Sequence, residues 1–371
     1  MIYLDSAATS MQKPAAVSRA VLQAMGSMAS PGRGGHPPAL RAADCLFQCR
    51  LLAAELFHVE DPEQVVFTFN ASHGLNLAIH SLIRPGQRVL MSGFEHNSVS
   101  RPLLASGAQV HTVGRTLFDP ARVLQDFENG LPHADAAVCT HVSNVFGFIL
   151  PIYEIAELCR RRGVPLIVDA SQSAGVLELD MQRLGAAFIA MPGHKGLLGP
   201  QGTGLLLCNH RCLPLLHGGS GSDSRSPHMP DYLPDRLEAG THNVPGIAGL
   251  KVGMEFIKSR GVSRICRHEQ DRMRQLANAL RDTELELFEG EEQTGVLSLR
   301  CPDVDGENLA RKLGESGVCV RAGLHCAPTA HKSAGTLETG TVRFSFSPFV
   351  SAEQVEQTAR ICRRILREFH K

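Results

Sequence analysis

A lysine that follows an apolar run and enters a glycine-rich turn is the residue of this sequence best suited to covalent chemistry. Lys195 comes after the run Ala186–Met191 and directly after His194, and several glycines follow it. A lysine amine that is partly desolvated, or that lies near other cations, becomes nucleophilic and can form a Schiff base with a carbonyl group. The alternative is a solvated lysine in an ordinary turn, and the Gly-His-Lys sequence alone does not decide between the two.

A carboxylate, Asp169, ends the strongest apolar run, Pro165–Val168. A carboxylate at that depth needs a partner, and the protonated ring nitrogen of a cofactor would be one. One helix and one strand separate Asp169 from Lys195, so both can face the same crevice. Pyridoxal phosphate enzymes need this pair, a lysine for the Schiff base and an acid on the pyridinium nitrogen. The alternative for Asp169 is a helix cap or a local loop bond.

One cysteine, Cys326, lies in a turn, whereas most of the others lie in apolar runs. A cysteine that is accessible and adjacent to a histidine, here His325, can have thiolate character and act as a nucleophile; the alternative is an inert loop thiol. Arg321 and Arg343 lie on predicted strands on either side of this turn. Each could bind a substrate carboxylate through its guanidinium group, or form an ordinary ion pair.

Two further sites follow predicted strands. Ser72, His73 and Gly74 lie where a strand gives way to a helix, a place where backbone N–H groups can bind a phosphate; an ordinary capped helix needs the same residue types. His96 follows another strand and could stack on a cofactor ring, although a lone histidine in a loop is more often structural.

The elements that must position these residues predict an α/β fold. Seven short apolar runs alternate with helical stretches, which indicates a mostly parallel seven-stranded sheet with helices on both faces and ligands beyond the carboxyl ends of the strands. The runs are Val65–Phe69, Arg88–Met91, Gln109–Val113, Ala136–Thr140, Pro165–Val168, Ala186–Met191 and Gly204–Cys208. Residues 209–246 are expected to form a long loop. We predict a large cofactor-binding domain at 12–245 and a smaller α+β domain at 1–11 and 246–371, which carries the Cys326 loop.

Composition narrows the function classes. The 371 residues carry 37 basic and 37 acidic side chains with no basic tract, so nucleic acid and anionic membranes are not expected partners. No apolar run reaches membrane-spanning length, and the N-terminus lacks the pattern of a secretory signal, so a cytoplasmic location is expected. The eleven cysteines are then predicted to be thiols, and without a Cys-x-x-Cys pair no metal site is predicted.

In combination, these residues resemble the class V aminotransferase family of pyridoxal phosphate enzymes. Within it they are most similar to the cysteine desulfurases and selenocysteine lyases of the sulfur-mobilisation group II. The resemblance covers nearly the whole chain, in the motifs Y-L-D-S-A-A-T, E-H-N-S, H-V-S-N-V-F-G, D-A-S-Q-S-A-G, G-H-K-G-L-L-G-P-Q-G-T-G, L-E-A-G-T-H-N, R-A-G-L-H-C-A-P and T-V-R-F-S. It implies the fold type I architecture of pyridoxal phosphate transferases.

The resemblance also implies a role for each motif residue. Lys195 would form the Schiff base, Asp169 would pair with the pyridinium, Gln172 would contact the ring hydroxyl, and His96 would stack on the ring and take part in catalysis. The phosphate would be held by Ser72, His73, His194 and, from the partner subunit of a homodimer, Thr241. The substrate would be contacted by Asn144, Arg343, Arg321 and Ala7, and Cys326 would attack its sulfur.

The reaction implied is conversion of L-cysteine to L-alanine, with a persulfide on Cys326 that passes to an acceptor protein. Alternatives are selenocysteine lysis, cysteine sulfinate desulfination, another aminotransferase-type activity and, more remotely, a non-enzymatic sulfur-carrier scaffold. Two positions depart from the family pattern. Pro192 stands where a phosphate-binding serine is common, and Leu324 stands where close relatives often have a second histidine.

Overall fold

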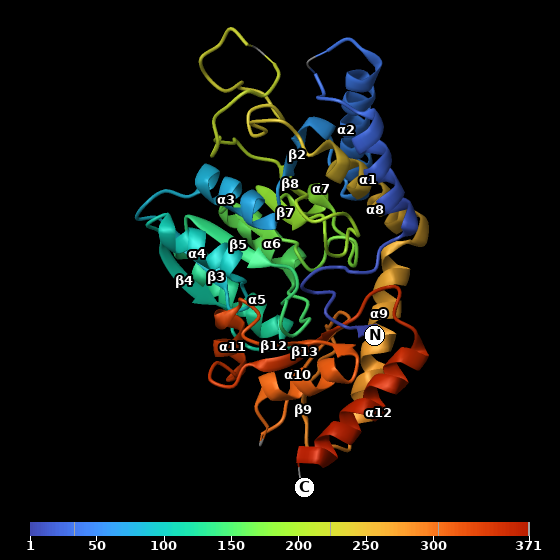
Figure 1. Ribbon diagram of the computed structural model, residues 1–371. Coiled ribbons are helices and arrows are strands. Elements are labelled where there is room, and N and C mark those ends of the chain that lie inside the picture. Colours follow the sequence, from blue (N-terminus) through green and yellow to red (C-terminus); the bar gives the residue numbers. More distant parts are fainter. Residues whose placement is uncertain (33, 223, 303, 370–371) are drawn as a thin grey trace.

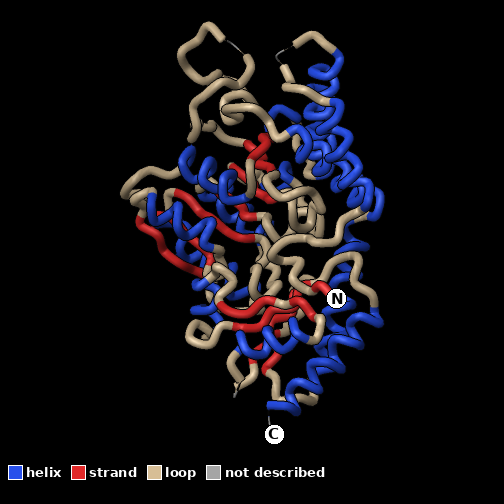
Figure 2. The backbone as a smooth tube through the Cα atoms, viewed as in Figure 1, coloured by secondary structure: helices blue, strands red, loops and turns tan. Residues whose placement is uncertain are grey.

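The chain folds into two packed parts. The computed structural model describes residues 1–32, 34–222, 224–302 and 304–369. Figure 1 places the C-terminal strands and helices at one end of the molecule and the loops between β8 and α8 at the opposite end, with the large sheet between them. The tube view in Figure 2 shows the N-terminal segment running along the junction of the two parts.

The large part contains the predicted seven-stranded sheet. The strand order is β2-β8-β7-β6-β5-β3-β4, and β8 alone runs antiparallel to its neighbours among the strands of this sheet. The prediction of a mostly parallel sheet is therefore confirmed. The strands are β2 (Val65–Thr68), β3 (Arg88–Ser92), β4 (Gln109–Val113), β5 (Ala136–Thr140), β6 (Leu166–Asp169), β7 (Phe188–Pro192) and β8 (Gly204–Cys208).

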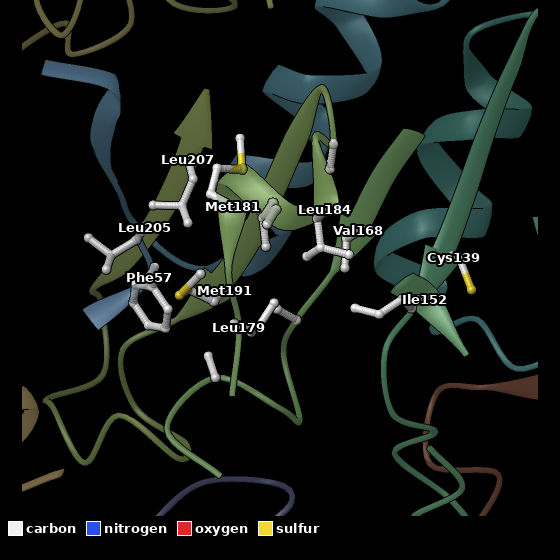
Figure 3. Packing of buried hydrophobic residues seen from close by; sticks show 14 of the residues in the cluster. Phe57, Cys139, Ile152, Val168, Leu179, Met181, Leu184, Met191, Leu205 and Leu207 are labelled. Carbon is white, nitrogen blue, oxygen red and sulfur yellow. The ribbon is translucent and has the colours of Figure 1, made fainter. Parts of the chain in front are cut away.

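Helices cover both faces of this sheet because side chains alternate along each buried strand. On β7, for example, Ile189 and Met191 belong to one apolar cluster and Ala190 to another. The first cluster, seen in Figure 3, joins the sheet to α2, α5, α6, α7 and α8, and the second joins it to α3 and α4. The helices of this part are α1 (Ala15–Ser27), α2 (Pro37–Leu56), α3 (Ala71–Leu82), α4 (Asn97–Ala105), α5 (Pro120–Gly130), α6 (Ile152–Arg162), α7 (Met181–Leu184) and α8 (Val244–Arg260).

Helix α8 is not predicted from the sequence. Its buried residues lie on several sides of the helix, so the sequence has no clear amphipathic stripe there. α8 packs against α1 and α2, and its Leu250 and Met254 belong to the core cluster of the large sheet. We therefore propose that the large domain extends to Gly261, beyond the boundary at residue 245 expected from the sequence.

The small part has its own apolar core. A four-stranded antiparallel sheet of order β12-β13-β10-β9 packs with three helices, and the N-terminal Ile2 and Leu4 join the same cluster. A capping box starts α12, in which the Ser351 amide donates to Gln354 Oε1 at 3.0 Å. The elements are β1 (Ile2–Tyr3), α9 (Val262–Leu280), β9 (Glu286–Phe288), β10 (Val296–Arg300), α10 (Gly306–Glu315), β11 (Val318–Cys319), β12 (Arg321–Gly323), α11 (Pro328–Ala334), β13 (Thr341–Ser345) and α12 (Ala352–Phe369).

Three further observations concern cysteines, metals and membranes. All eleven cysteines lie within the described residues and are free thiols, as predicted, and Cys326 is the exposed one among them. In the described ranges, no three His, Cys, Asp or Glu side chains are grouped as a metal site would require. Across those same ranges, the helices are too short or too polar to cross a bilayer.

Candidate active site

A cavity of about 220 Å³ lies where the carboxyl ends of the large-sheet strands face the small domain. Its wall brings together residues from motifs that are far apart in the sequence. The predicted site residues that line it are Ala7, Ser72, His96, Asn144, Asp169, Gln172, His194, Lys195, Arg321 and Arg343. This is the position in which open parallel sheets bind their ligands.

Lys195 and Asp169 reach the cavity from neighbouring parallel strands, since β6 ends at Asp169 and pairs with β7. Burial lowers the pKa of Lys195 to about 8, and the nearby Arg343 and Arg321 act in the same direction while Asp169 opposes them. Burial raises the pKa of Asp169, whose Oδ1 accepts a hydrogen bond from the Ser171 amide at 2.9 Å. An amine that loses its proton easily beside a buried acid is the pair that pyridoxal phosphate requires.

The end of the cavity near α3 presents polar groups to an anion. Asn70 caps α3 and accepts a hydrogen bond from the His73 amide at 2.9 Å. The preceding amides, those of Ala71 and Ser72, begin the helix, where the backbone offers no helical acceptor. The Ser72 side chain and the His194 ring both line the cavity here. A helix start of this kind fits a phosphate group.

His194 and Gln172 are held by the N-terminal segment. His194 Nδ1 lies 3.1 Å from Thr9 Oγ1, and burial, followed by the charge of Lys195, lowers the pKa of His194 to about 4. Gln172 Nε2 donates to the carbonyl of Ala7 at 3.0 Å. The first ten residues therefore form part of the site wall. This explains why the N-terminal motif Y-L-D-S-A-A-T, which has few reactive side chains, is among the motifs shared with the family.

His96 is the N-cap of α4, and its ring is fixed by that helix. Its Nδ1 accepts a hydrogen bond from the Ser98 amide at 3.0 Å and lies 2.9 Å from Ser98 Oγ. Burial lowers the pKa of His96 to about 4, with Lys195 as the next cause. The ring is therefore neutral near pH 7, and because Nδ1 accepts from a backbone amide, its proton resides on Nε2. A neutral ring of this kind can stack on a flat cofactor.

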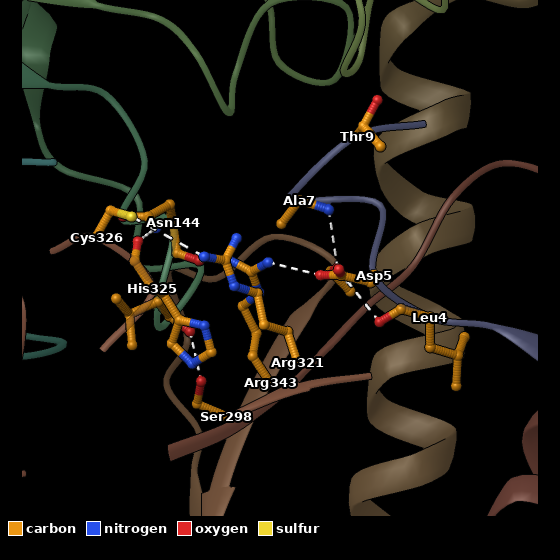
Figure 4. Close-up of polar contacts among 12 residues, drawn as sticks. Leu4, Asp5, Ala7, Thr9, Asn144, Ser298, Arg321, His325, Cys326 and Arg343 are labelled. Atoms are coloured by element: carbon orange, nitrogen blue, oxygen red, sulfur yellow. Dashed lines mark hydrogen bonds and ion pairs between the residues drawn. The ribbon is translucent and has the colours of Figure 1, made fainter. Parts of the chain in front are cut away.

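Arg343 and Asn144 form the polar wall shown in Figure 4. The Arg343 side chain is only 1% exposed, and its guanidinium donates to Asp5 Oδ1 at 2.7 Å and to the Asn144 carbonyl at 2.8 Å. Asn144 Nδ2 donates to the carbonyl of His325 at 2.8 Å. Arg343 Nε and Asn144 Oδ1 are buried without a partner among the described residues. Since buried polar atoms are nearly always paired, these two point to a polar ligand.

Cys326 does not line this cavity but lies beside it. Its sulfur is 3.9 Å from an Arg321 guanidinium nitrogen, and its carbonyl accepts a hydrogen bond from the Asn97 amide at 2.7 Å. Cys326 and His325 adopt φ values of 57° and 49°, which is the left-handed region that residues other than glycine rarely occupy. Such conformations concentrate at functional sites. The prediction that Cys326 is accessible is confirmed.

The structure does not bring His73 and Thr241 into the Lys195 cavity. Both line a second cavity, together with Phe69 and Gly240. The His73 ring stacks on Phe69 with centroids 4.6 Å apart, and its Nδ1 accepts a hydrogen bond from the Phe69 amide at 3.3 Å. These contacts hold the His73 side chain away from the site that the sequence assigned to it, although its helix does contribute to that site.

Three residues of the site are not among those predicted from the sequence to bind the cofactor or the substrate. Asp5 pairs with Arg343, and Ser98 and His325 line the cavity. The sequence singles out His325 only as the neighbour of Cys326, whereas in the structure its Nε2 lies 3.1 Å from the Thr341 carbonyl and burial lowers its pKa to about 2. No local pattern distinguishes Asp5 or Ser98. The signals available for them are the motifs that contain them, Y-L-D-S-A-A-T for Asp5 and E-H-N-S for Ser98.

Comparisons with known proteins show which family this chain belongs to. The family model "Aminotransferase class-V" matches residues 2–358. A probable cysteine desulfurase of Methanothermobacter thermautotrophicus is 33% identical over 96% of this chain and 92% of its own length. A probable cysteine desulfurase of Pyrococcus abyssi is 30% identical, again over 96% of this chain and 92% of its own length.

Solved structures similar to this chain are also cysteine desulfurases. An apo cysteine desulfurase from Thermococcus onnurineus NA1 superimposes with a TM-score of 0.91 at 29% identity, covering 99% of this chain and 95% of that one. The cysteine desulfurase CsdA from Escherichia coli gives a TM-score of 0.88 at 26% identity, covering 98% and 94%. Because the family model spans nearly all of its length, the chain belongs to the class V aminotransferases.

Proposed function

We propose that this chain is a pyridoxal phosphate-dependent cysteine desulfurase that converts L-cysteine to L-alanine. The observation that carries the proposal is the convergence of Lys195 and Asp169 in one cavity with an exposed cysteine, Cys326, beside it. The names of the relatives described above support the same substrate. Lys195 and Asp169 are the residue types that bind the cofactor, and the Cys326 thiol can accept the substrate's sulfur.

The residues of the cavity fit pyridoxal phosphate. Lys195 would hold it covalently, Asp169 would pair with its ring nitrogen, and Gln172 and His96 would contact its ring. Ser72 and His194 would bind the phosphate, with the start of α3. When bound, the cofactor supplies an electron sink that stabilises negative charge on the substrate's α-carbon.

The substrate's carboxylate would be bound by Arg343, with Asn144 next to it. Asp5 holds the guanidinium in place through a part-buried ion pair, and Arg343 Nε, which has no partner among the described residues, supplies a further donor. Lys195, with its pKa lowered to about 8, is a suitable base for the proton on the substrate's α-carbon once its nitrogen is free.

Cys326 would then take the sulfur atom. Its thiolate attacks the substrate's sulfur, a new S–S bond forms and the C–S bond breaks, with that bond's electron pair left on carbon, which gains a proton. The products are L-alanine and a persulfide on Cys326. The exposed loop at β12 lets an acceptor protein's thiol reach the outer sulfur, which regenerates Cys326.

We also propose that the working form is a homodimer in which Thr241 reaches the partner's phosphate site. Thr241 lines a cavity other than the one that holds Lys195 of the same chain. Apolar surface lies near it, since Phe69 is 53% exposed and Leu216 is 43% exposed. A second copy of the chain would cover this surface.

The test is an assay of alanine and sulfide release from L-cysteine under reducing conditions. The wild-type protein loaded with pyridoxal phosphate is expected to release both, and Cys326→Ala is expected to release neither, because no other described cysteine is exposed. Cys319→Ala, which removes a half-buried thiol on β11, the strand that precedes β12 in the sequence, is the matched control and should retain activity.

Selenocysteine and cysteine sulfinate complete the substrate panel. Their cleavage is expected to depend less on Cys326 than that of L-cysteine. Undiminished L-cysteine turnover by Cys326→Ala would disprove the nucleophile assignment. Activity confined to selenocysteine or to sulfinate would replace the desulfurase proposal with one of those activities.

A further inference from the structure

The phosphate end of the cavity lacks a donor at the position where β7 ends. Pro192 is the last residue of β7 and lines the cavity, and a proline has neither a side-chain hydroxyl nor a backbone N–H. A phosphate carries a high charge on a few oxygens and is bound best by several converging donors. Another group of this chain must therefore supply the donor that Pro192 cannot.

Ser98 is placed to supply it. It is the second residue of α4, and it lines the same cavity as Ser72, His194 and Pro192. Its Oγ lies 2.7 Å from Ser72 Oγ, at the start of α3. Two hydroxyls from two different helices are therefore adjacent at the end of the cavity assigned to the phosphate.

The first backbone amides of α4 already donate to other groups, so the Ser98 hydroxyl is the donor that this end of the helix can offer a ligand. The Asn97 amide donates to the Cys326 carbonyl at 2.7 Å, and the Val99 amide donates to the His96 carbonyl at 2.9 Å. The Ser98 amide donates to His96 Nδ1 at 3.0 Å. All three amides already have acceptors, so α4 differs from α3, whose first amides have no helical acceptor.

The Ser98 hydroxyl can turn toward a ligand at little cost. It lies 2.9 Å from His96 Nδ1, but that nitrogen already receives the Ser98 amide hydrogen. A hydroxyl hydrogen rotates to suit its surroundings. Reorienting it therefore leaves no buried acceptor without a partner.

We infer that the Ser98 hydroxyl donates a hydrogen bond to the phosphate group of bound pyridoxal phosphate, next to Ser72, and thereby replaces the donor that is absent at Pro192. This inference rests on the proposed function, because it concerns the cofactor of that same site. Ser98 should therefore contribute to the binding of the phosphate group and not to the binding of the pyridine ring.

The experiment compares two ligands that differ only in the phosphate. Apo-protein of the wild type and of Ser98→Ala is dialysed to equilibrium against pyridoxal phosphate and against pyridoxal, and bound ligand is measured by absorbance. Loss of one hydrogen bond to a charged group is expected to raise the dissociation constant for pyridoxal phosphate about tenfold. The dissociation constant for pyridoxal should stay unchanged.

Three further variants control the result. Ser100→Ala removes a hydroxyl from the same helix that does not line the cavity and that donates to Asn97 Oδ1 at 3.5 Å. This variant should bind both ligands as the wild type does. Ser98→Thr keeps the hydroxyl and should retain the affinity for pyridoxal phosphate. Pro192→Ser, added to Ser98→Ala, should recover part of the lost affinity.

The measurements distinguish failure of the Ser98 inference from failure of the proposed function. Equal weakening of both ligands by Ser98→Ala would show a structural role and overturn the inference. Unchanged affinity for both ligands would overturn it as well. If the wild-type apo-protein binds neither ligand, the proposed function fails together with the inference, whereas normal binding by the wild type and by Ser98→Ala refutes the inference alone.

Discussion

At the scale of single residues, the decisive property of the site is the state of the Lys195 amine. Burial and two arginines favour loss of its proton, and Asp169 opposes them. The result is a pKa lowered to about 8. Below that pH the amine carries a proton and has no lone pair to react, and above it the amine is neutral and nucleophilic.

The lowered pKa of Lys195 should determine how the chemical labelling of its amine in the apo-protein depends on pH. Reductive methylation with formaldehyde, followed by peptide mass spectrometry, is expected to label Lys195 with a rate that rises with pH and levels off above about pH 9. Asp169→Asn removes the carboxylate that raises the pKa of Lys195, so the midpoint of its profile should move to lower pH. A profile that still climbs at pH ~10, as an unperturbed lysine's would, contradicts this assignment.

At the scale of elements, the turn that carries Lys195 is held in place by α8. A Cβ added to Gly253 of α8 would lie 2.4 Å from the Leu197 carbonyl oxygen and 3.0 Å from the carbonyl carbon of Leu198. These are backbone atoms two and three residues beyond Lys195, so they cannot yield as a flexible side chain would. The absence of a side chain at Gly253 is therefore what lets the helix approach the reactive turn.

Gly253→Ala is accordingly expected to lower stability by about 1–3 kcal/mol, as overpacking typically does, and to weaken cofactor binding by displacing the turn. Denaturant unfolding of the apo-protein measures the first effect, and equilibrium dialysis measures the second. Gly314→Ala is the matched control, because α10 has open space at that position and alanine should stabilise an exposed helix by up to ~1 kcal/mol. Equal behaviour of the two variants would contradict the packing argument.

At the scale of the whole molecule, the proposed dimer divides each active site between two chains. Lys195 and Ser72 line one cavity of a chain, and Thr241 lines another. A hybrid of a Lys195→Ala chain with a Thr241→Val chain then contains one site with both an intact lysine and an intact partner threonine. Its second site carries both defects.

Hybrids purified through two different affinity tags should therefore bind pyridoxal phosphate at one site with wild-type affinity, although neither parent homodimer does. A hybrid of Lys195→Ala with Ser72→Ala is the control. Both of those residues serve the cavity of their own chain, so its only lysine-bearing site stays defective and affinity should not recover. If the Thr241→Val hybrid binds no better than the Thr241→Val homodimer, Thr241 does not act on the partner's site.

The sequence by itself determined the strands of the large sheet and the three residues on which the proposed chemistry depends, Lys195, Asp169 and Cys326. Six strands of the large sheet are buried along nearly their whole length and therefore appear in the sequence as apolar runs, whereas the edge strand β4 is only partly buried. The short runs nevertheless predicted all seven strands. A lysine and an acid that follow two of these runs predicted the pair at Lys195 and Asp169, since neighbouring parallel strands end at the same edge. Cys326 could be singled out because it lies in a turn, and it is indeed the exposed thiol among the described residues.

Only the tertiary structure decided which polar groups complete the site. Asp5 contacts Arg343 across 338 residues of sequence, and Ser72 meets Ser98 from a different helix. Such contacts depend on how helices and the N-terminal segment pack on the sheet, and no local periodicity encodes them. The same holds for α8, whose burial on several sides hides its helical pattern, and for His73, which a stacking contact with Phe69 turns away from the cavity.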